Sequence, residues 1–180
     1  MNAIQAVWNW LDQVVIGLNL CPFAAKPRRQ NQIYVIEFLG TELSQLDQFL
    51  LEQLDALNEL SAEERETSLI VIPNLLQKFD DYLDYLDQAQ FLLERAGLEG
   101  IIQIASFHPD YCFAGSQPTD VENLTNRAPY AILHLIREDS LSHVLARYPN
   151  PERIPEINME TMKSLTSAQR LTLFPYLYKT

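Results

Sequence analysis

A histidine, a carboxylate and a thiol alternate along one short stretch of the chain, residues 107–115. The three side chains belong to His108, Asp110 and Cys112. If the backbone is extended there, they point to the same side, and Pro109 favours that geometry because it disfavours helix at the preceding residue. A histidine that a carboxylate orients is a good general base. We therefore predict that His108 is a catalytic base and that Asp110 orients it.

A second polar group stands before a predicted helix over residues 128–147. Thr125 or Asn126 can cap that helix, and free backbone N–H groups beside Arg127 attract carboxylate or phosphate. Helical spacing would place Arg127, His134 and Glu138 on one side. We predict that Asn126, Arg127 and His134 bind a ligand. The alternative is a structural ion pair beside a core histidine, and the sequence leaves both open.

Cys21 is a third candidate for chemistry. It follows the end of the first predicted helix and lies near Lys26 in the chain. A positive neighbour lowers the pKa of a thiol and makes the thiolate nucleophilic, so Cys21 is a candidate catalytic residue. Free cysteines are also commonly buried as small hydrophobic side chains, and Pro22 and Phe23 after Cys21 fit that alternative.

Metal and cofactor motifs are weak in this sequence. The alternating stretch, completed by His134 or Cys21 as a fourth ligand, has donor atoms that suit zinc or iron. The set lacks the paired CxxC or HExxH spacing of a strong metal signature. The sequence also has no glycine-rich phosphate loop, GxSxG elbow or dinucleotide fingerprint. We therefore predict no metal site, and the sequence does not identify a cofactor.

Hydrophobic periodicity predicts the elements that hold these residues. A first helix covers residues 4–18, and strands separated by helices follow it. The expected strands are 33–39, 69–72 and 101–107, and the expected helices are 41–57, 79–93, 128–147 and 150–165. Residues 164–180 are compatible with a short helix, an edge strand or a docked tail.

The alternation of strands and helices predicts an α/β fold with a small, mainly parallel three-stranded sheet. The order is strand-helix-strand-helix-strand, and the sheet is packed between helices, with N-terminal and C-terminal helices added. Ligands bind beyond the carboxyl ends of parallel strands. Because His108 and the start of the helix at Arg127 should emerge at that edge, we expect them to line one cavity.

Length and charge limit the possible function classes. The 180 residues suit a single domain over 1–180, and the net charge of −11 argues against nucleic acid and anionic membrane surfaces as partners. Two cysteines indicate free thiols in a reducing compartment, and the N-terminus has no basic signal-peptide region. No apolar run approaches the ~18 residues of a membrane span. We therefore predict a cytoplasmic protein, whose oligomeric state the sequence leaves open.

Three segments together resemble a known family. They are LNLCPFA at 18–24, ASFHPDY at 105–111, and NR at 126–127 with HLIRE at 134–138. Over nearly the whole chain, the sequence resembles a family of bacterial proteins catalogued as a domain of unknown function, number fourteen-fifteen in that series. The resemblance implies no particular activity. Its motif positions here are Cys21, His108, Asp110, Asn126, Arg127 and His134. Glutamine is common in the family where this chain has Cys112, which argues against an essential role for that thiol.

Two functions of different classes fit these observations. The first is an enzyme or binder of a small anionic metabolite. Its site would combine His108, Asp110, Asn126, Arg127 and His134, with Cys21 nearby. The second is a non-catalytic protein-interaction or structural module in which the same polar residues are structural. Side chains that converge in a pocket would favour the first function, and side chains that are each bonded to backbone would favour the second.

Overall fold

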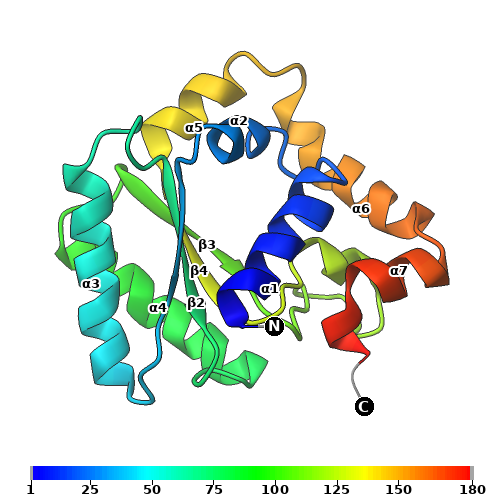
Figure 1. Cartoon of the computed structure of the whole chain (residues 1–180), viewed down its shortest axis with the longest axis horizontal. Helices are drawn as coiled ribbons and strands as arrows, with labels where there is room; N and C mark the ends of the chain where they lie inside the picture. Colours follow the sequence, from blue (N-terminus) through cyan, green and yellow to red (C-terminus); the bar gives the residue numbers. More distant parts are fainter. Residues whose placement is uncertain (1, 179–180) are drawn as a thin grey trace.

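The computed structural model describes residues 2–178 and contains a four-stranded mixed sheet with helices on both faces (Figure 1). The strands are β1 Ile33–Glu37, β2 Thr67–Ile72, β3 Ile102–Phe107 and β4 Ala131–Arg137. They lie in the order β1-β2-β4-β3. β1 pairs with β2 in parallel, whereas β4 pairs antiparallel with both β2 and β3. The three strands expected from the sequence are present, and they run in one direction on either side of β4.

Strand β4 corrects the predicted fold. The sheet is not three-stranded and mainly parallel, because residues 131–137 form a central strand where we expected part of a helix over 128–147. Leu133 belongs to the core on one face of the sheet and Ile132 to the core on the other. A short run that is apolar on both faces shows neither the helical nor the strand periodicity of hydrophobic residues. The pattern of residues 131–137 therefore does not distinguish a buried strand from a helix. Of the helix predicted over 128–147, only the part that forms α5, Glu138–Leu145, is helical.

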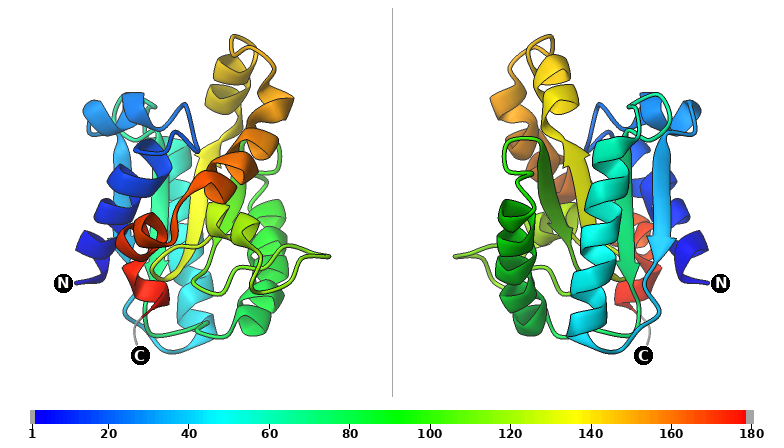
Figure 2. Two further views of the ribbon diagram at one scale, coloured as in Figure 1. Left: turned by 90° about the vertical axis from the view of Figure 1, so that its right-hand side faces the viewer. Right: turned by 90° about the vertical axis from the view of Figure 1, so that its left-hand side faces the viewer.

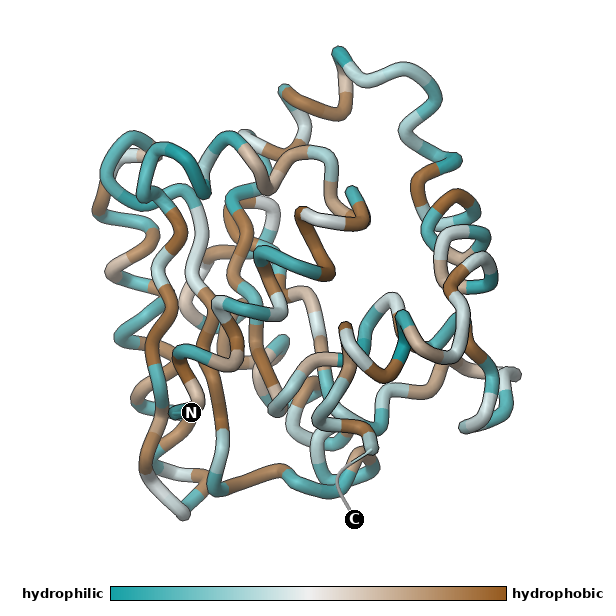
Figure 3. Tube along the Cα trace, turned by 45° about the vertical axis from the view of Figure 1, so that its right-hand side comes forward, coloured by the Kyte–Doolittle hydropathy of each residue, from teal (hydrophilic) through white to brown (hydrophobic). Residues whose placement is uncertain are grey.

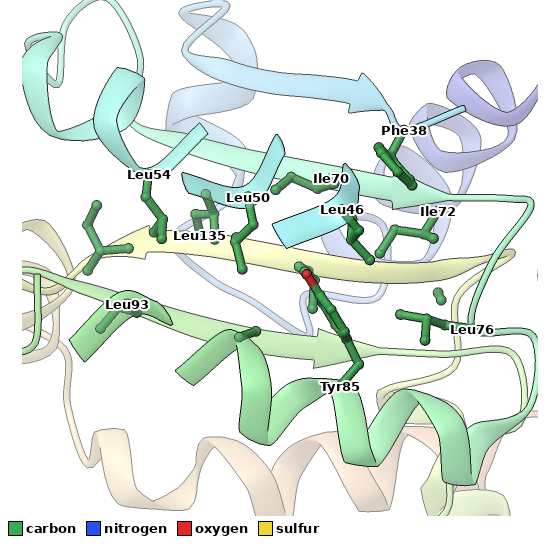
Figure 4. Close-up of a cluster of buried hydrophobic side chains, with 14 of the residues drawn as sticks. Phe38, Leu46, Leu50, Leu54, Ile70, Ile72, Leu76, Tyr85, Leu93 and Leu135 are labelled. Carbon is green, nitrogen blue, oxygen red and sulfur yellow. The ribbon is translucent and has the colours of Figure 1, made fainter. Parts of the chain in front are cut away.

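Helices α3 and α4 cover one face of the sheet (Figure 2). α3 spans Leu43–Glu59 and α4 spans Phe79–Arg95, close to the predicted ranges. The inward side of α3 is a row of completely buried leucines at helical spacing: Leu46, Leu50, Leu54 and Leu57. Figure 4 labels the first three of them. Burying each leucine contributes on the order of 2 kcal/mol, so this row holds α3 against the sheet.

The opposite face is covered by helices from both ends of the chain (Figure 2). They are α1 Ala3–Trp10, which continues as the π-helix η1 Leu11–Ile16, then α6 Ile154–Ser164 and α7 Ser167–Leu173. Val7, Val14 and Met162 from these segments, and Phe174 directly after α7, have no exposed surface. The predicted helices over 4–18 and 150–165 are therefore present in outline.

The C-terminal segment left open by the sequence is a short helix followed by a turn. Thr166 caps α7 through a capping box with Gln169, and the turn η4, Pro175–Leu177, follows.

Figure 3 shows hydrophobic residues gathered along the strands and polar residues on the outer loops. Among residues 2–178, no helix combines the length and the apolar character needed to cross a membrane.

His134 lies in the middle of β4, between Leu69 of β2 and Ala105 of β3. The hydroxyl of Thr67 donates to the backbone oxygen of Leu135 over 2.6 Å, so it accepts a hydrogen bond from His134 Nε2 over 2.7 Å. This arrangement requires the proton on Nε2. Burial lowers the pKa of His134 to about 4, which keeps the ring neutral at physiological pH.

We predict that the free energy of unfolding falls as the pH drops from about 6.5 towards 4.5. The unfolded chain takes up a proton on His134 near the ordinary pKa of 6.5, whereas the folded chain resists protonation until about pH 4. The loss at His134 should be on the order of 2 kcal/mol. Urea denaturation at several pH values measures it.

His134→Gln is the matched variant, because glutamine keeps an N–H donor for Thr67 and does not titrate. Its stability should fall less steeply across this pH range. An identical pH dependence in the wild type and the variant would contradict the prediction.

Candidate functional site

His108, the predicted catalytic base, is completely buried. Its Nε2 donates a hydrogen bond to the backbone oxygen of Leu76 over 3.0 Å, and its Nδ1 accepts one from the backbone N–H of Asp110 over 3.0 Å. Burial lowers the pKa of His108, so the ring is a neutral Nε2–H tautomer. Asp110 therefore contacts the His108 ring through its backbone amide, and not through the carboxylate that we expected to orient the ring. A base needs a free nitrogen, and here both nitrogens are occupied.

The surroundings of His108 are aromatic. Its ring centroid lies 5.3 Å from that of Phe79 and 5.2 Å from that of Tyr82, both on α4. Its partner Leu76 has a φ of 56°, a left-handed conformation that is costly for a leucine. The histidine bond stabilises this unusual backbone in the loop between β2 and α4. The His108 ring thus links the end of β3 to the loop between β2 and α4.

Asn126 joins the end of β3 to the start of β4. Its backbone oxygen accepts a hydrogen bond from the backbone N–H of His108 over 3.2 Å. Its side-chain amide donates to the backbone oxygen of Ser106 over 3.2 Å. The segments at His108 and Arg127 are therefore neighbours, as expected. They do not line one cavity, because the His108 ring is buried away from solvent. Asn126 also caps no helix over 128–147, since that helix does not exist.

Arg127 holds the loop that follows β3. Its Nε donates to the backbone oxygen of Tyr111 over 3.1 Å and its Nη2 to that of Pro118 over 2.7 Å. The expected grouping of Arg127 with His134 and Glu138 on one helix side is wrong, because these residues are spread along and beyond β4. Arg127 takes part in none of the ion pairs found within residues 2–178.

Asn123 organises the same loop from the inside. It is completely buried. Its Oδ1 accepts hydrogen bonds from the Phe113 backbone N–H (3.0 Å) and the Ser116 hydroxyl (2.8 Å), and its Nδ2 donates to the Gln117 backbone oxygen (2.8 Å). The side-chain amide of Asn123 thus makes hydrogen bonds to backbone groups that regular secondary structure would otherwise satisfy. We did not single out Asn123 for this role, because residue type alone does not reveal burial in a loop.

Cys21 shows no sign of activation. Cys21 is partly buried, and burial raises the pKa of its thiol, opposite to the lowering expected near Lys26. Cys112 is also a free thiol. Within residues 2–178, no three His, Cys, Asp or Glu side chains are placed to share a metal ion. The proposed zinc or iron set around residues 108–112 is therefore not assembled.

A pocket of about 280 Å³ opens beside Arg127, and His108 is not among its lining residues. Arg170 from α7 also lines it, and its Nε is buried without a hydrogen-bonding partner. The two arginines are held together because the Tyr176 hydroxyl, just after α7, donates to the Arg127 backbone oxygen over 3.0 Å. Arg170 was missed from the sequence, since residues 164–180 carried no clear pattern.

We predict that Asn123→Asp destabilises the protein by on the order of 3 kcal/mol at pH 7. The substitution keeps the shape of the side chain but replaces the amide donor to Gln117 with an oxygen, in a buried site. Denaturant unfolding measures the change. Asn2→Asp is the matched control, because Asn2 is exposed and caps α1 only as an acceptor, a role that aspartate keeps. Equal effects of the two substitutions would contradict the assignment.

Comparison with known proteins gives one match. The model of a family described as "Protein of unknown function (DUF1415)" matches residues 2–171, a range that includes both Arg127 and Arg170. No curated protein and no solved structure matches significantly. Because the family model covers nearly all of the sequence, the chain belongs to the DUF1415 family.

Proposed function

We propose that the protein binds a small anionic metabolite in the pocket between Arg127 and Arg170. One observation carries the proposal: two guanidinium groups line the same pocket, and neither pairs with a carboxylate within residues 2–178. Guanidinium groups bind carboxylate and phosphate through paired hydrogen bonds, so these two arginines suit either anion.

The buried Nε of Arg170 supports an external partner. A buried donor without an acceptor costs roughly 1–3 kcal/mol, and more when it is charged. An oxyanion in the pocket would supply that acceptor and would also neutralise charge. Arg127 already uses two donors on backbone oxygens, which fixes the direction of its guanidinium group and leaves further N–H groups for a ligand.

The walls of the pocket restrict the kind of anion. Val121, Leu124 and Leu177 supply apolar surface, and the volume lies at the small end for ligand sites. Asp120 also lines the pocket, but its Oδ2 accepts a hydrogen bond from the Gln117 backbone N–H over 2.7 Å. A small phosphate ester or carboxylate with an apolar part would fit these features.

The proposal is for binding without catalysis by the predicted residues. His108, Asn126 and His134 are each bonded to neighbouring protein groups, which supports the alternative hypothesis for them as structural residues. A protein-interaction role stays open as the second candidate function. A cytoplasmic location and the absence of nucleic acid as a partner stay part of the proposal, since the two thiols are free and the charge is strongly negative.

We predict that ~10 mM phosphate raises the melting temperature of the wild type. A ligand that binds only the folded state stabilises it by RT ln(1 + [L]/Kd), about 1.4 kcal/mol if Kd is ~1 mM. For a chain of this length that corresponds to a shift of about 4 °C. Thermal melts at matched ionic strength, with sodium chloride as the reference, measure the shift.

Arg170→Gln should abolish the phosphate shift while leaving the protein folded, because it removes a charge that has no partner in the protein. Arg147→Ala is the control: Arg147 is exposed, lies outside the pocket, and its removal should leave the shift intact. Arg127→Lys should keep the charge but weaken the loop, since lysine cannot bond both backbone oxygens in the same way. No phosphate shift in the wild type, or an equal shift in Arg170→Gln, would reject the proposal.

A further inference from the structure

The pocket between Arg127 and Arg170 also contains a carboxylate, and this carboxylate is kept apart from both guanidinium groups. Asp120 lines the pocket, yet within residues 2–178 it forms no ion pair with either arginine. Arginine and carboxylate attract each other strongly and pair through parallel hydrogen bonds where the geometry allows. The pocket therefore presents positive and negative groups at separate places on its wall.

Hydrogen bonds to the loop backbone hold these groups in their separate places. Asp120 Oδ2 accepts from the Gln117 backbone N–H over 2.7 Å, and the Asp120 N–H donates to the Gln117 backbone oxygen over 2.9 Å. Arg127 is directed by the backbone oxygens of Tyr111 and Pro118. Within residues 2–178, Asp120 Oδ1 forms no hydrogen bond, so it can accept one from a ligand.

Lys163 is a further positive group that interacts with Asp120, and it does so only over a longer range. Its Nζ lies 2.8 Å from Glu122 Oε1, so this ammonium group already has a carboxylate partner. Lys163 also does not line the pocket. The Asp120 carboxylate can thus balance a positive charge that a ligand brings.

We propose that the ligand is a free α-amino acid with an aliphatic side chain, an inference that rests on the proposed anion site. The ligand carboxylate would accept from Arg127 and from the buried Nε of Arg170, which has no acceptor within residues 2–178. The ammonium group, one carbon away from that carboxylate, would donate to Asp120 Oδ1. The side chain would contact the apolar wall, where Leu124 is buried.

Other small anions match this pocket less completely. A phosphate ester would satisfy the arginines but would place a second negative group beside Asp120, and like charges at such a contact cost binding free energy. A monocarboxylic acid would leave Asp120 without a positive partner. The volume of about 280 Å³, at the small end for ligand sites, favours a single amino acid over a peptide.

Titration calorimetry of the full chain compares L-leucine with 4-methylpentanoate, which is the same carbon skeleton without the amino group. We expect L-leucine to bind saturably at one site. 4-Methylpentanoate should bind about tenfold more weakly, because it loses one charge-assisted contact. L-Leucinamide, which lacks the carboxylate, should not bind measurably. Inorganic phosphate should compete with L-leucine, since both need the two arginines.

Asp120→Asn removes the negative charge of the pocket and little else. Asparagine keeps an oxygen that accepts from the Gln117 N–H, so the loop should stay folded, which circular dichroism verifies. The variant should bind L-leucine about tenfold more weakly than the wild type does, and 4-methylpentanoate at least as tightly. Asp87→Asn is the matched control, because Asp87 is exposed on α4 and lies outside the pocket, and it should leave both affinities unchanged.

The phosphate shift and its loss in Arg170→Gln test the anion site separately from the amino-acid ligand. Equal affinities of the wild type for L-leucine and 4-methylpentanoate would overturn the amino-acid ligand, even if phosphate raises the melting temperature. Unchanged L-leucine binding in Asp120→Asn, or no L-leucine binding up to ~10 mM, would overturn it in the same way. L-Leucine binding that Arg170→Gln retains in full would overturn both proposals.

Discussion

Strand β4 is hydrogen bonded along both edges, to β2 and to β3, and the remaining structure depends on this double pairing. β2 and β3 run in the same direction but never touch as partners, because β4 lies between them in the opposite direction. The strand supplies Leu133 to one core and Ile132 to the other. It therefore joins the two halves of the sheet and both helical layers at once.

The reversed direction of β4 also decides where the polar groups gather. Because β4 starts where β3 ends, the connection between them must turn within the carboxyl edge of the sheet. Tyr82 links the end of β3 to the start of β4, since its hydroxyl donates to the backbone oxygen of Ile132 and accepts from the backbone N–H of Phe107. Asn123 and Arg127 then hold the long loop by binding its backbone. Most polar side chains at this edge are hydrogen bonded to other groups of the protein. A polar side chain there that has no such partner is therefore a candidate for ligand binding.

Much of the fold was predictable because its signals are local. The leucine spacing of α3 and the apolar runs of β1, β2 and β3 identify these elements within a few residues. β4 was not predictable, since a run that is buried on both faces shows no period. The site was harder still. His108 was correctly placed at the sheet edge, but only the fold shows that Leu76 and Asp110 occupy both of its nitrogens. Arg170 becomes significant only when α7 brings it beside Arg127.

The position of β4 in the chain has a consequence for biosynthesis. A ribosome makes β1, β2 and β3 before it makes β4, so the sheet stays open while most of the protein already exists. One edge of β2 and the whole of β3 lack partners until residues 131–137 leave the exit tunnel. Unpaired apolar strands are the segments that nascent chains present to chaperones and to each other. A pause in translation shortly before residue 131 would prolong that exposure, and rapid synthesis through β4 would end it.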